Sequence, residues 1–169
     1  MELPVKFIKA HAVWSIVILA LCVVVGAVVS FAGAKRISPM SWGWYGQINA
    51  PGGVAIDGYG PVAYHQSGGP TKGDGKYAVE WRGARWHFAT AENRALFESN
   101  HEKYAPQFGG FCAYAASTGF TAKTEPTAWR IEQGRLYLFN EEGVRDKWVS
   151  ELKEDVIGRG EKAWAARRR

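Results

Sequence analysis

A long apolar stretch near the amino terminus, residues 12–34, limits what this chain can be more than any other feature. It contains no charged residue; Lys9 precedes it, and Lys35 and Arg36 follow it. As a helix rising about 1.5 Å per residue it would be roughly 35 Å long, enough to cross a hydrocarbon layer about 30 Å thick. We therefore expect residues 12–34 to form a transmembrane helix in contact with membrane lipid, preceded by a short tail, residues 1–11.

A cleaved secretory signal is the competing interpretation of the same stretch. Lys6 and Lys9 would form its basic region, and Ala32-Gly33-Ala34 has the small residues that signal peptidase prefers. The hydrophobic region of a signal peptide is normally about 7 to 15 residues long, which is shorter than this stretch. The length therefore favours a retained anchor.

The flanking charges indicate on which side of the membrane the rest of the chain lies. Two basic residues stand on each side of the stretch, and the next basic residue after Arg36 is Lys72. The amino terminus adds a positive charge to the short flank, and positive flanks tend to stay in the cytoplasm. We expect a single-pass protein of the bacterial inner (cytoplasmic) membrane whose domain is periplasmic or otherwise extracytoplasmic.

The remainder of the chain is long enough for one compact domain but too short for two. The net charge of +5 is compatible with nucleic-acid binding, but its distribution argues against that class. Four of the 21 basic residues flank the apolar stretch and three form a basic tail, 167–169, which leaves 14 basic and 15 acidic residues in 37–166. This pattern fits anionic lipid headgroups better than a nucleic-acid groove. A solvated tail without a role is an equal alternative.

Residues 35–55 are rich in Gly, Pro, Ser and Trp and have no regular period, so we expect a linker. Trp42, Trp44 and Tyr45 lie a few residues beyond the apolar stretch, where aromatic rings favour the lipid headgroup region. Packing of these rings against the domain is an equal alternative.

Residues 56–166 predict one α+β domain with two β-hairpins and three to four helices. Thr90 can cap a helix that continues to Ala105. A short buried helix is expected from Phe111, and a terminal helix or helix pair over 144–164.

Alternating apolar and polar residues indicate the two hairpins. The first would turn at Gly83-Ala84, which sets Trp81 opposite Trp86. The second would turn at Gln133-Gly134.

Four stretches follow one another in an order that is typical of one family: 58–64, 86–93, 97–107 and 109–115. Together they resemble the stand-alone bacterial YHS-domain proteins. The resemblance implies a small YHS-type fold for the domain without implying an activity. Some members are described as selenoproteins, which implies one redox-active chalcogen position, and Cys112 is the candidate for it in this domain.

YHS and TRASH domains attached to metal transporters and sensors carry two cysteines that are taken as their metal ligands. At the matching positions this chain has Ala89 and Asn93, which are not soft-metal ligands. The resemblance therefore does not carry that metal role over to this chain.

A metal site for copper or zinc would have to be assembled through space from His65, His87 and Cys112, because the histidines lie too far apart in sequence for a zinc finger. Each residue has a plainer interpretation. His65 can lie in a surface turn, and His87 can pair with Glu80 across the first hairpin. Cys112 can be a small buried hydrophobe.

Cys112 is also the candidate redox thiol. Gly109 and Gly110 would leave a helix N-terminus at Phe111, whose N–H groups favour a thiolate and lower the pKa of a nearby cysteine. Burial would have the opposite effect on that pKa.

A small-ligand pocket is conceivable under four aromatic residues, which an aromatic core explains equally well: Tyr59, Tyr64, Trp86 and Tyr114. The sequence has no Gly-rich phosphate loop and no GxSxG motif, which argues against an enzyme. The leading hypothesis is a membrane-anchored, non-enzymatic domain that binds a small ligand, a metal ion or a partner protein. The alternatives are a thiol redox module and a structural tether in a membrane complex.

Overall fold

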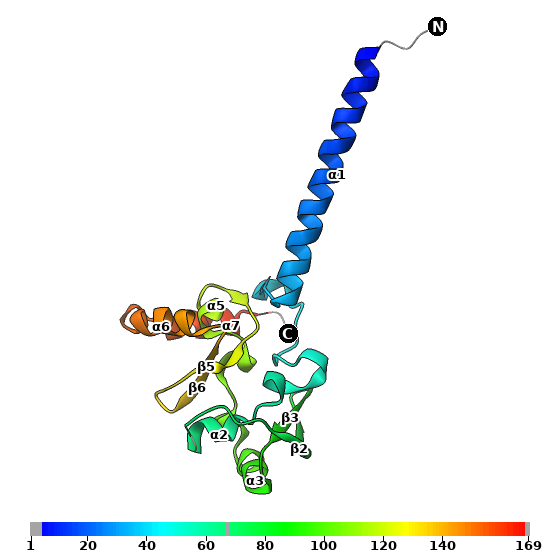
Figure 1. Ribbon diagram of the computed structural model, residues 1–169. Helices are drawn as coiled ribbons and strands as arrows, with labels where there is room; N and C mark the ends of the chain where they lie inside the picture. The colour runs from blue at the N-terminus through cyan, green and yellow to red at the C-terminus, as the bar shows by residue number, and fades with distance from the viewer. Residues whose placement is uncertain (1–4, 67, 168–169) are drawn as a thin grey trace. The chain divides into compact units, whose positions relative to one another are not determined.

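The protein is described by a computed structural model that covers residues 5–66 and 68–167. The chain divides into two compact units, one that ends at Lys35 and one that begins at Arg36. Helix α1, Val5–Ala34, forms the first unit, and the remaining elements belong to the second (Figure 1).

The segment Trp14–Ala34 of α1 has a mean hydropathy of 2.8, and none of it is buried. By length and composition it could cross a membrane, although a signal sequence passes the same test. The predicted tail 1–11 is in part helical, because α1 begins at Val5, and residues 1–4 lie outside the described residues.

The second unit is a mixed α+β domain, as the sequence predicted at that level. Its strands form three antiparallel pairs: β1 (Ser38–Pro39) with β4 (Phe120–Thr121), β2 (Asp74–Trp81) with β3 (Ala84–Phe88), and β5 (Glu125–Glu132) with β6 (Arg135–Phe139). Its α-helices are α2 (Pro61–Gln66), α3 (Ala91–Ser99), α4 (His101–Tyr104), α5 (Ala113–Ser117), α6 (Glu142–Ser150) and α7 (Val156–Ala165). Short 3-10 helices connect them: η1 (Met40–Trp42), η2 (Pro51–Gly53), η3 (Ala55–Gly58), η4 (Gln107–Gly110) and η5 (Leu152–Glu154).

Within the described residues the domain has more α-helices than the three to four predicted, because the first expected helix, 90–105, is divided and α2 was not among the predicted helices. Asn100 interrupts the first: its side chain accepts from the N–H of Lys103 and starts α4. Asp155 has φ of 57° and caps α7 by accepting from the N–H of Gly158, so the C-terminal segment is a helix pair. Thr90 caps α3 as predicted.

The turn of the first hairpin differs from the prediction by one residue. The loop is Arg82-Gly83, with φ of 51° and 74°, and Trp81 pairs with Ala84 instead of Trp86. Two positive φ angles are typical of a type I′ turn, which favours Gly at the second loop position. A Gly83-Ala84 loop would place Gly first and force Ala84 out of its buried strand position.

The second hairpin turns at Gln133-Gly134 with φ of 50° and 73°, as predicted. Its strand β6 is buried on both faces. Leu136 and Leu138 point into one hydrophobic core, whereas Tyr137 and Phe139 point into another. Successive residues of a strand face opposite sides, so β6 separates the two cores.

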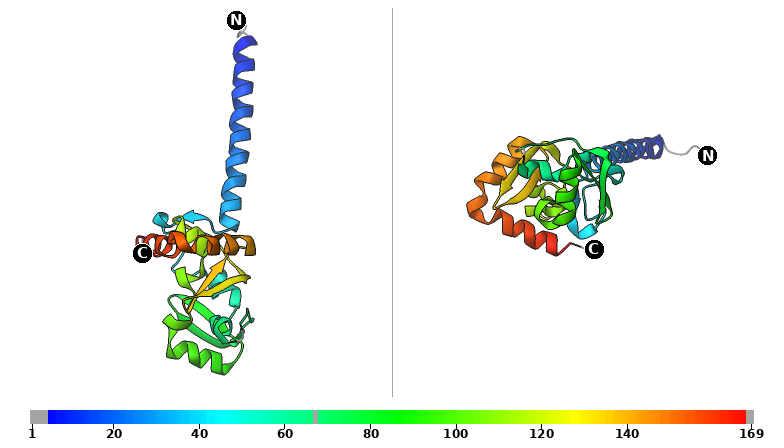
Figure 2. Two further views of the ribbon diagram at one scale, coloured as in Figure 1. Left: turned by 90° about the vertical axis from the view of Figure 1, so that its left-hand side faces the viewer. Right: turned by 90° about the horizontal axis from the view of Figure 1, so that it is seen from below.

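The two cores lie at opposite ends of the domain. The first contains side chains from β3, α2 and α3, and the second contains side chains from α5, α6 and α7. Figures 1 and 2 show α3 and the β2–β3 hairpin at one end, and α5, α6 and α7 at the other.

The predicted linker, residues 35–55, is for the most part no free linker, because the domain begins at Arg36 and several residues of this segment are bonded to it. Ser38 of β1 is buried beside Thr121 of β4, with 3.3 Å between their hydroxyl oxygens. The backbone N–H of Asn49 donates to the carbonyl oxygen of Gly109 at 2.8 Å. The Asn49 side chain donates to Gly110 and Thr124, so a short polar residue inside a Gly-rich segment anchors it.

Gly109→Ala is expected to destabilise the domain by roughly 2–5 kcal/mol. Gly109 has φ of 62°, and a Cβ there would overlap the carbonyl oxygen of Gln47. Gly134→Ala is the matched control, because Gly134 has φ of 73° and open space around it; it should cost only about 1–2 kcal/mol. Urea unfolding of the full chain in detergent measures both, and equal costs would contradict this packing of residues 36–55.

Candidate functional site

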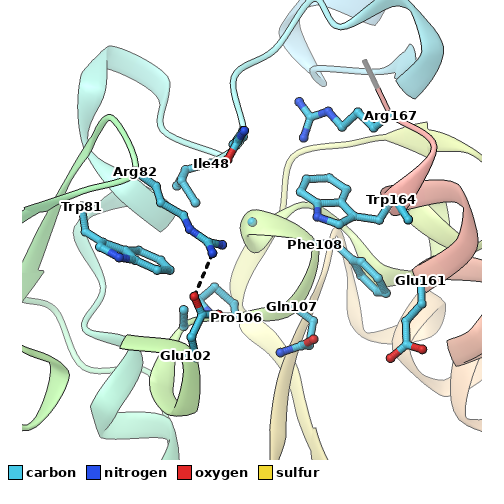
Figure 3. Close-up of a pocket in the computed structure, with 14 residues that line it drawn as sticks. Ile48, Trp81, Arg82, Glu102, Pro106, Gln107, Phe108, Glu161, Trp164 and Arg167 are labelled. Atoms are coloured by element: carbon cyan, nitrogen blue, oxygen red, sulfur yellow. Dashed lines mark hydrogen bonds and ion pairs between the residues drawn. The ribbon is translucent and has the colours of Figure 1, made fainter. Parts of the chain in front are cut away.

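A cleft of about 530 Å³ opens between the two cores (Figure 3). This volume lies within the roughly 300–1,000 Å³ of known small-molecule pockets. Trp81 and Arg82 line one wall, and Trp164 and Arg167 line the other. Phe108 of η4 lies beside Trp164 on the second wall. The cleft therefore presents one indole ring and one guanidinium group on each side.

The Trp81 wall is held in place by rings of the first core. Trp81 ends β2, and its ring stacks on His101 with 5.2 Å between centroids and an interplanar angle of 12°. It also contacts Phe97 edge-on at 5.7 Å and Trp86 edge-on at 5.8 Å. These contacts fix the orientation of the indole while leaving it half-exposed in the cleft.

The Trp164 wall is held by rings of the second core. Trp164 lies on α7, and its ring centroid is 6.0 Å from that of Phe108 and 6.2 Å from that of Phe111. Gly160 of the same helix allows close packing, since a Cβ at this position would lie 2.8 Å from the Phe108 ring. The wall is therefore preorganised.

Most charged side chains of the cleft have an ionic partner. Arg82 donates from Nη2 to Oε1 of Glu102 at 2.8 Å, with both side chains half or more exposed. Glu161 accepts from Nη1 of Arg135 at 2.7 Å. Exposed pairs of this kind add little to stability, but they neutralise the two carboxylates of the cleft.

Arg167 is different, because no carboxylate partner is found for it among the described residues. Its guanidinium carbon lies 4.4 Å from the ring centroid of Trp164, and Nη2 donates to the carbonyl oxygens of Tyr45 and Gly46. Nη1 is buried without a hydrogen-bond partner. Burial lowers the pKa of the Arg167 guanidinium from its usual value. The tail 167–169 was expected either to contact lipid headgroups or to be solvated. Arg167 instead packs into the domain, and residues 168–169 lie outside the described residues.

This arrangement can bind an anion that carries a flat apolar group. A half-buried guanidinium with an unpaired N–H donor is stabilised by a carboxylate or phosphate oxygen in a charge-assisted hydrogen bond. The indole rings offer apolar surface to the rest of such a ligand.

Cys112, the predicted redox thiol, is 1% exposed and lies in the second core. Helix α5 begins at Ala113, directly after Cys112 and two residues after the predicted start at Phe111. Burial raises the pKa of the Cys112 thiol, although backbone N–H groups, including those of Ala115 and Asn140, act against it. The thiol donates to Oδ1 of Asn140 at 3.5 Å. This environment is typical of an unreactive structural cysteine.

The residues proposed for a metal site lie in different surroundings. His65 packs edge-on against Tyr104, 5.5 Å between centroids, and His87 lies on β3 beside Gly58 and Gly75. The predicted pair of His87 with Glu80 is not formed, because Ala78 lies opposite His87 in the sheet. Across the described residues, no group of three or more His, Cys, Asp or Glu side chains could hold a metal ion.

The four aromatic residues predicted to form a pocket do not line the cleft. Tyr64 and Trp86 are buried in the first core; Tyr64 donates to the carbonyl oxygen of Pro126 at 3.0 Å. Tyr114 donates to Glu151 at 3.2 Å in the second core, and Tyr59 lies under the Lys72 ammonium.

Sequence reasoning missed the cleft because its residues come from four distant segments. Trp81 was assigned to a strand, Trp164 to a helix and Arg167 to a tail, and each assignment describes only the local structure. The sequence offered no signal for the cleft, because the partial exposure of these residues follows from the packing of the two cores.

Comparison with known proteins finds no match among family models, curated proteins or solved structures. The YHS resemblance rests on the four stretches of sequence that suggested it.

Cys112 is expected to resist modification by iodoacetamide at neutral pH in the folded protein, because the thiol is both buried and protonated. The measurement is mass spectrometry of a Cys22→Ser variant in detergent, with and without denaturant. Labelling should appear only in denaturant. Rapid labelling of the folded protein would instead support the redox-thiol hypothesis.

Proposed function

We propose that this protein is a membrane-anchored, non-enzymatic domain of YHS type that binds a small anionic ligand in the cleft between Trp81 and Trp164. The observation that carries the proposal is the Arg167 guanidinium, which is half-buried and stacked on Trp164 and has a buried donor without a partner.

The composition of the cleft supports binding more than catalysis. Its described lining residues include no Ser, Thr, Cys, His or Lys that could act as nucleophile or base, and its two carboxylates are paired with arginines. What the walls do supply is aromatic surface and one unpaired positive charge. These features favour a ligand with a carboxylate or phosphate on a flat apolar body.

The other sequence hypotheses gain less support. The burial of Cys112 and the raised pKa of its thiol argue against the redox module. The metal hypothesis requires His65, His87 and Cys112 to meet, and these three residues have separate environments. The structural tether stays a prediction.

The anchor in this proposal is α1, which would hold the domain at the bacterial inner membrane on its extracytoplasmic side. Its length and apolar composition support a membrane span. The orientation follows from the flanking charges alone. On this side of the membrane the cleft would meet ligands outside the cytoplasm.

The cleft is expected to bind 2-naphthoate, used as an anionic aromatic probe, more tightly than the neutral 2-naphthamide. Arg167→Gln should weaken naphthoate binding by about 10- to 100-fold, because a hydrogen bond to a charged group is lost. Isothermal titration calorimetry of the full chain in detergent measures both affinities.

Arg145→Gln is the matched control, because Arg145 pairs with Asp146 on α6 and does not line the cleft. It should leave naphthoate binding unchanged. Equal binding of the acid and the amide, or an Arg167→Gln variant with unaltered affinity, would count against the proposal.

The full chain is expected to stay in the membrane fraction after alkaline carbonate extraction, since α1 would be a retained span. Amino-terminal sequencing of the extracted protein is the accompanying measurement, and it should read the original terminus. A soluble product that begins at Lys35, just after Ala34, would identify the stretch as a cleaved signal.

A further inference from the structure

The exposed large hydrophobic side chains of the domain, among the described residues, come from two segments that the β1–β4 pair joins. Among the described residues after Lys35 they are Ile37, Trp42, Trp44 and Phe120. Trp44 is 67% exposed and Trp42 is 55% exposed, values close to those of the lipid-facing candidates in α1. We call these four residues the apolar edge.

The β1–β4 pair brings the apolar edge together from two distant parts of the chain. Pro39 pairs with Phe120, so Phe120 lies next to the segment that carries the other three residues. The backbone N–H of Met40 also donates to the carbonyl oxygen of Gly119 at 2.9 Å. The edge is therefore a tertiary feature and not merely an apolar run in the sequence.

Buried residues of the same segment fix the apolar edge to the domain. Ser38 and Met40 are each 3% exposed, and Ser38 lies within hydrogen-bond distance of Thr121. The rings of Trp42 and Trp44 contact each other, with 4.5 Å between centroids. The segment is therefore fixed to the domain by its buried residues, while its two indole rings stay exposed.

The covalent connection to α1 restricts what can cover this edge. Three residues, 35–37, join Ala34, at the end of the apolar helix, to Ser38, which is fixed in the domain, so four Cα–Cα steps separate the two. At a maximum of about 3.5 Å per residue, Ser38 lies within roughly 14 Å of the helix end, whatever the angle between the two units. If α1 spans a bilayer, the apolar edge stays next to the headgroup layer, where Trp is enriched.

We propose that the apolar edge is a second membrane contact, which inserts Trp42 and Trp44 into the lipid headgroup region and orients the domain on the bilayer. The inference rests on the membrane anchoring in the proposed function and is independent of the ligand in the cleft. We assign lipid as the partner of the apolar edge, because the short connection to α1 keeps the edge at a bilayer surface and indole rings partition into the headgroup layer.

The experiment is a depth measurement by spin labelling of the full chain in nanodiscs of phosphatidylcholine and phosphatidylglycerol. A nitroxide is placed at Ser41→Cys, between the apolar residues, in a Cys22→Ser, Cys112→Ala background. Ser99→Cys, at the exposed end of α3, is the matched control. Leu19→Cys in α1 reports on the anchor.

The Ser41 label should be several-fold more accessible to oxygen, relative to a water-soluble nickel complex, than the Ser99 label. Trp42→Ser with Trp44→Ser should move the Ser41 value toward the Ser99 value. The inference is wrong if the Leu19 label has the oxygen-to-nickel accessibility ratio of a bilayer interior while the Ser41 label has that of a water-exposed site. That result would leave the anchor in place. Water values at all three sites overturn the anchor and this inference together, and a Ser41 label shielded from both reagents identifies a protein contact and overturns the lipid assignment.

Discussion

Strand β6 is the element on which the rest of the domain depends, because both of its faces are buried. Leu136 and Leu138 fill the core beneath α3, and Tyr137 and Phe139 fill the core beneath α6. All four side chains are at most 1% exposed. A change at any one of them would therefore affect packing in one core directly and the position of the other core through the shared backbone.

The cleft is a consequence of this division. Two cores that meet at one strand leave space between them beyond that strand. Ligand pockets are commonly found where separately packed parts of a protein meet. Trp81 lines the cleft on the side of the first core, and Trp164 lines it on the side of the second. The Asn49 backbone bond to Gly109 connects the amino-terminal segment of the domain to the same region. Arg167 also bonds to this segment through the carbonyl oxygens of Tyr45 and Gly46.

Local sequence signals were reliable where one or two residues decide the backbone. Gln133-Gly134 gave the second turn, and Thr90 gave the start of α3. The first turn differs by one residue from the predicted Gly83-Ala84 loop, because the two positive φ angles fall at Arg82 and Gly83. The prediction of a free linker was wrong, because Asn49 forms hydrogen bonds to residues far along the chain and so fixes this Gly-rich segment to the domain.

The sequence by itself determined the apolar helix, the α+β class and the burial of Cys112, since hydropathy, period and residue type act locally. Only the tertiary structure decided which side chains share a surface. It placed Trp81 and Trp164 across one cleft, and it set Phe120 beside the segment that carries Trp42 and Trp44. These groupings depend on contacts between residues far apart in the chain, and no local pattern encodes such distances.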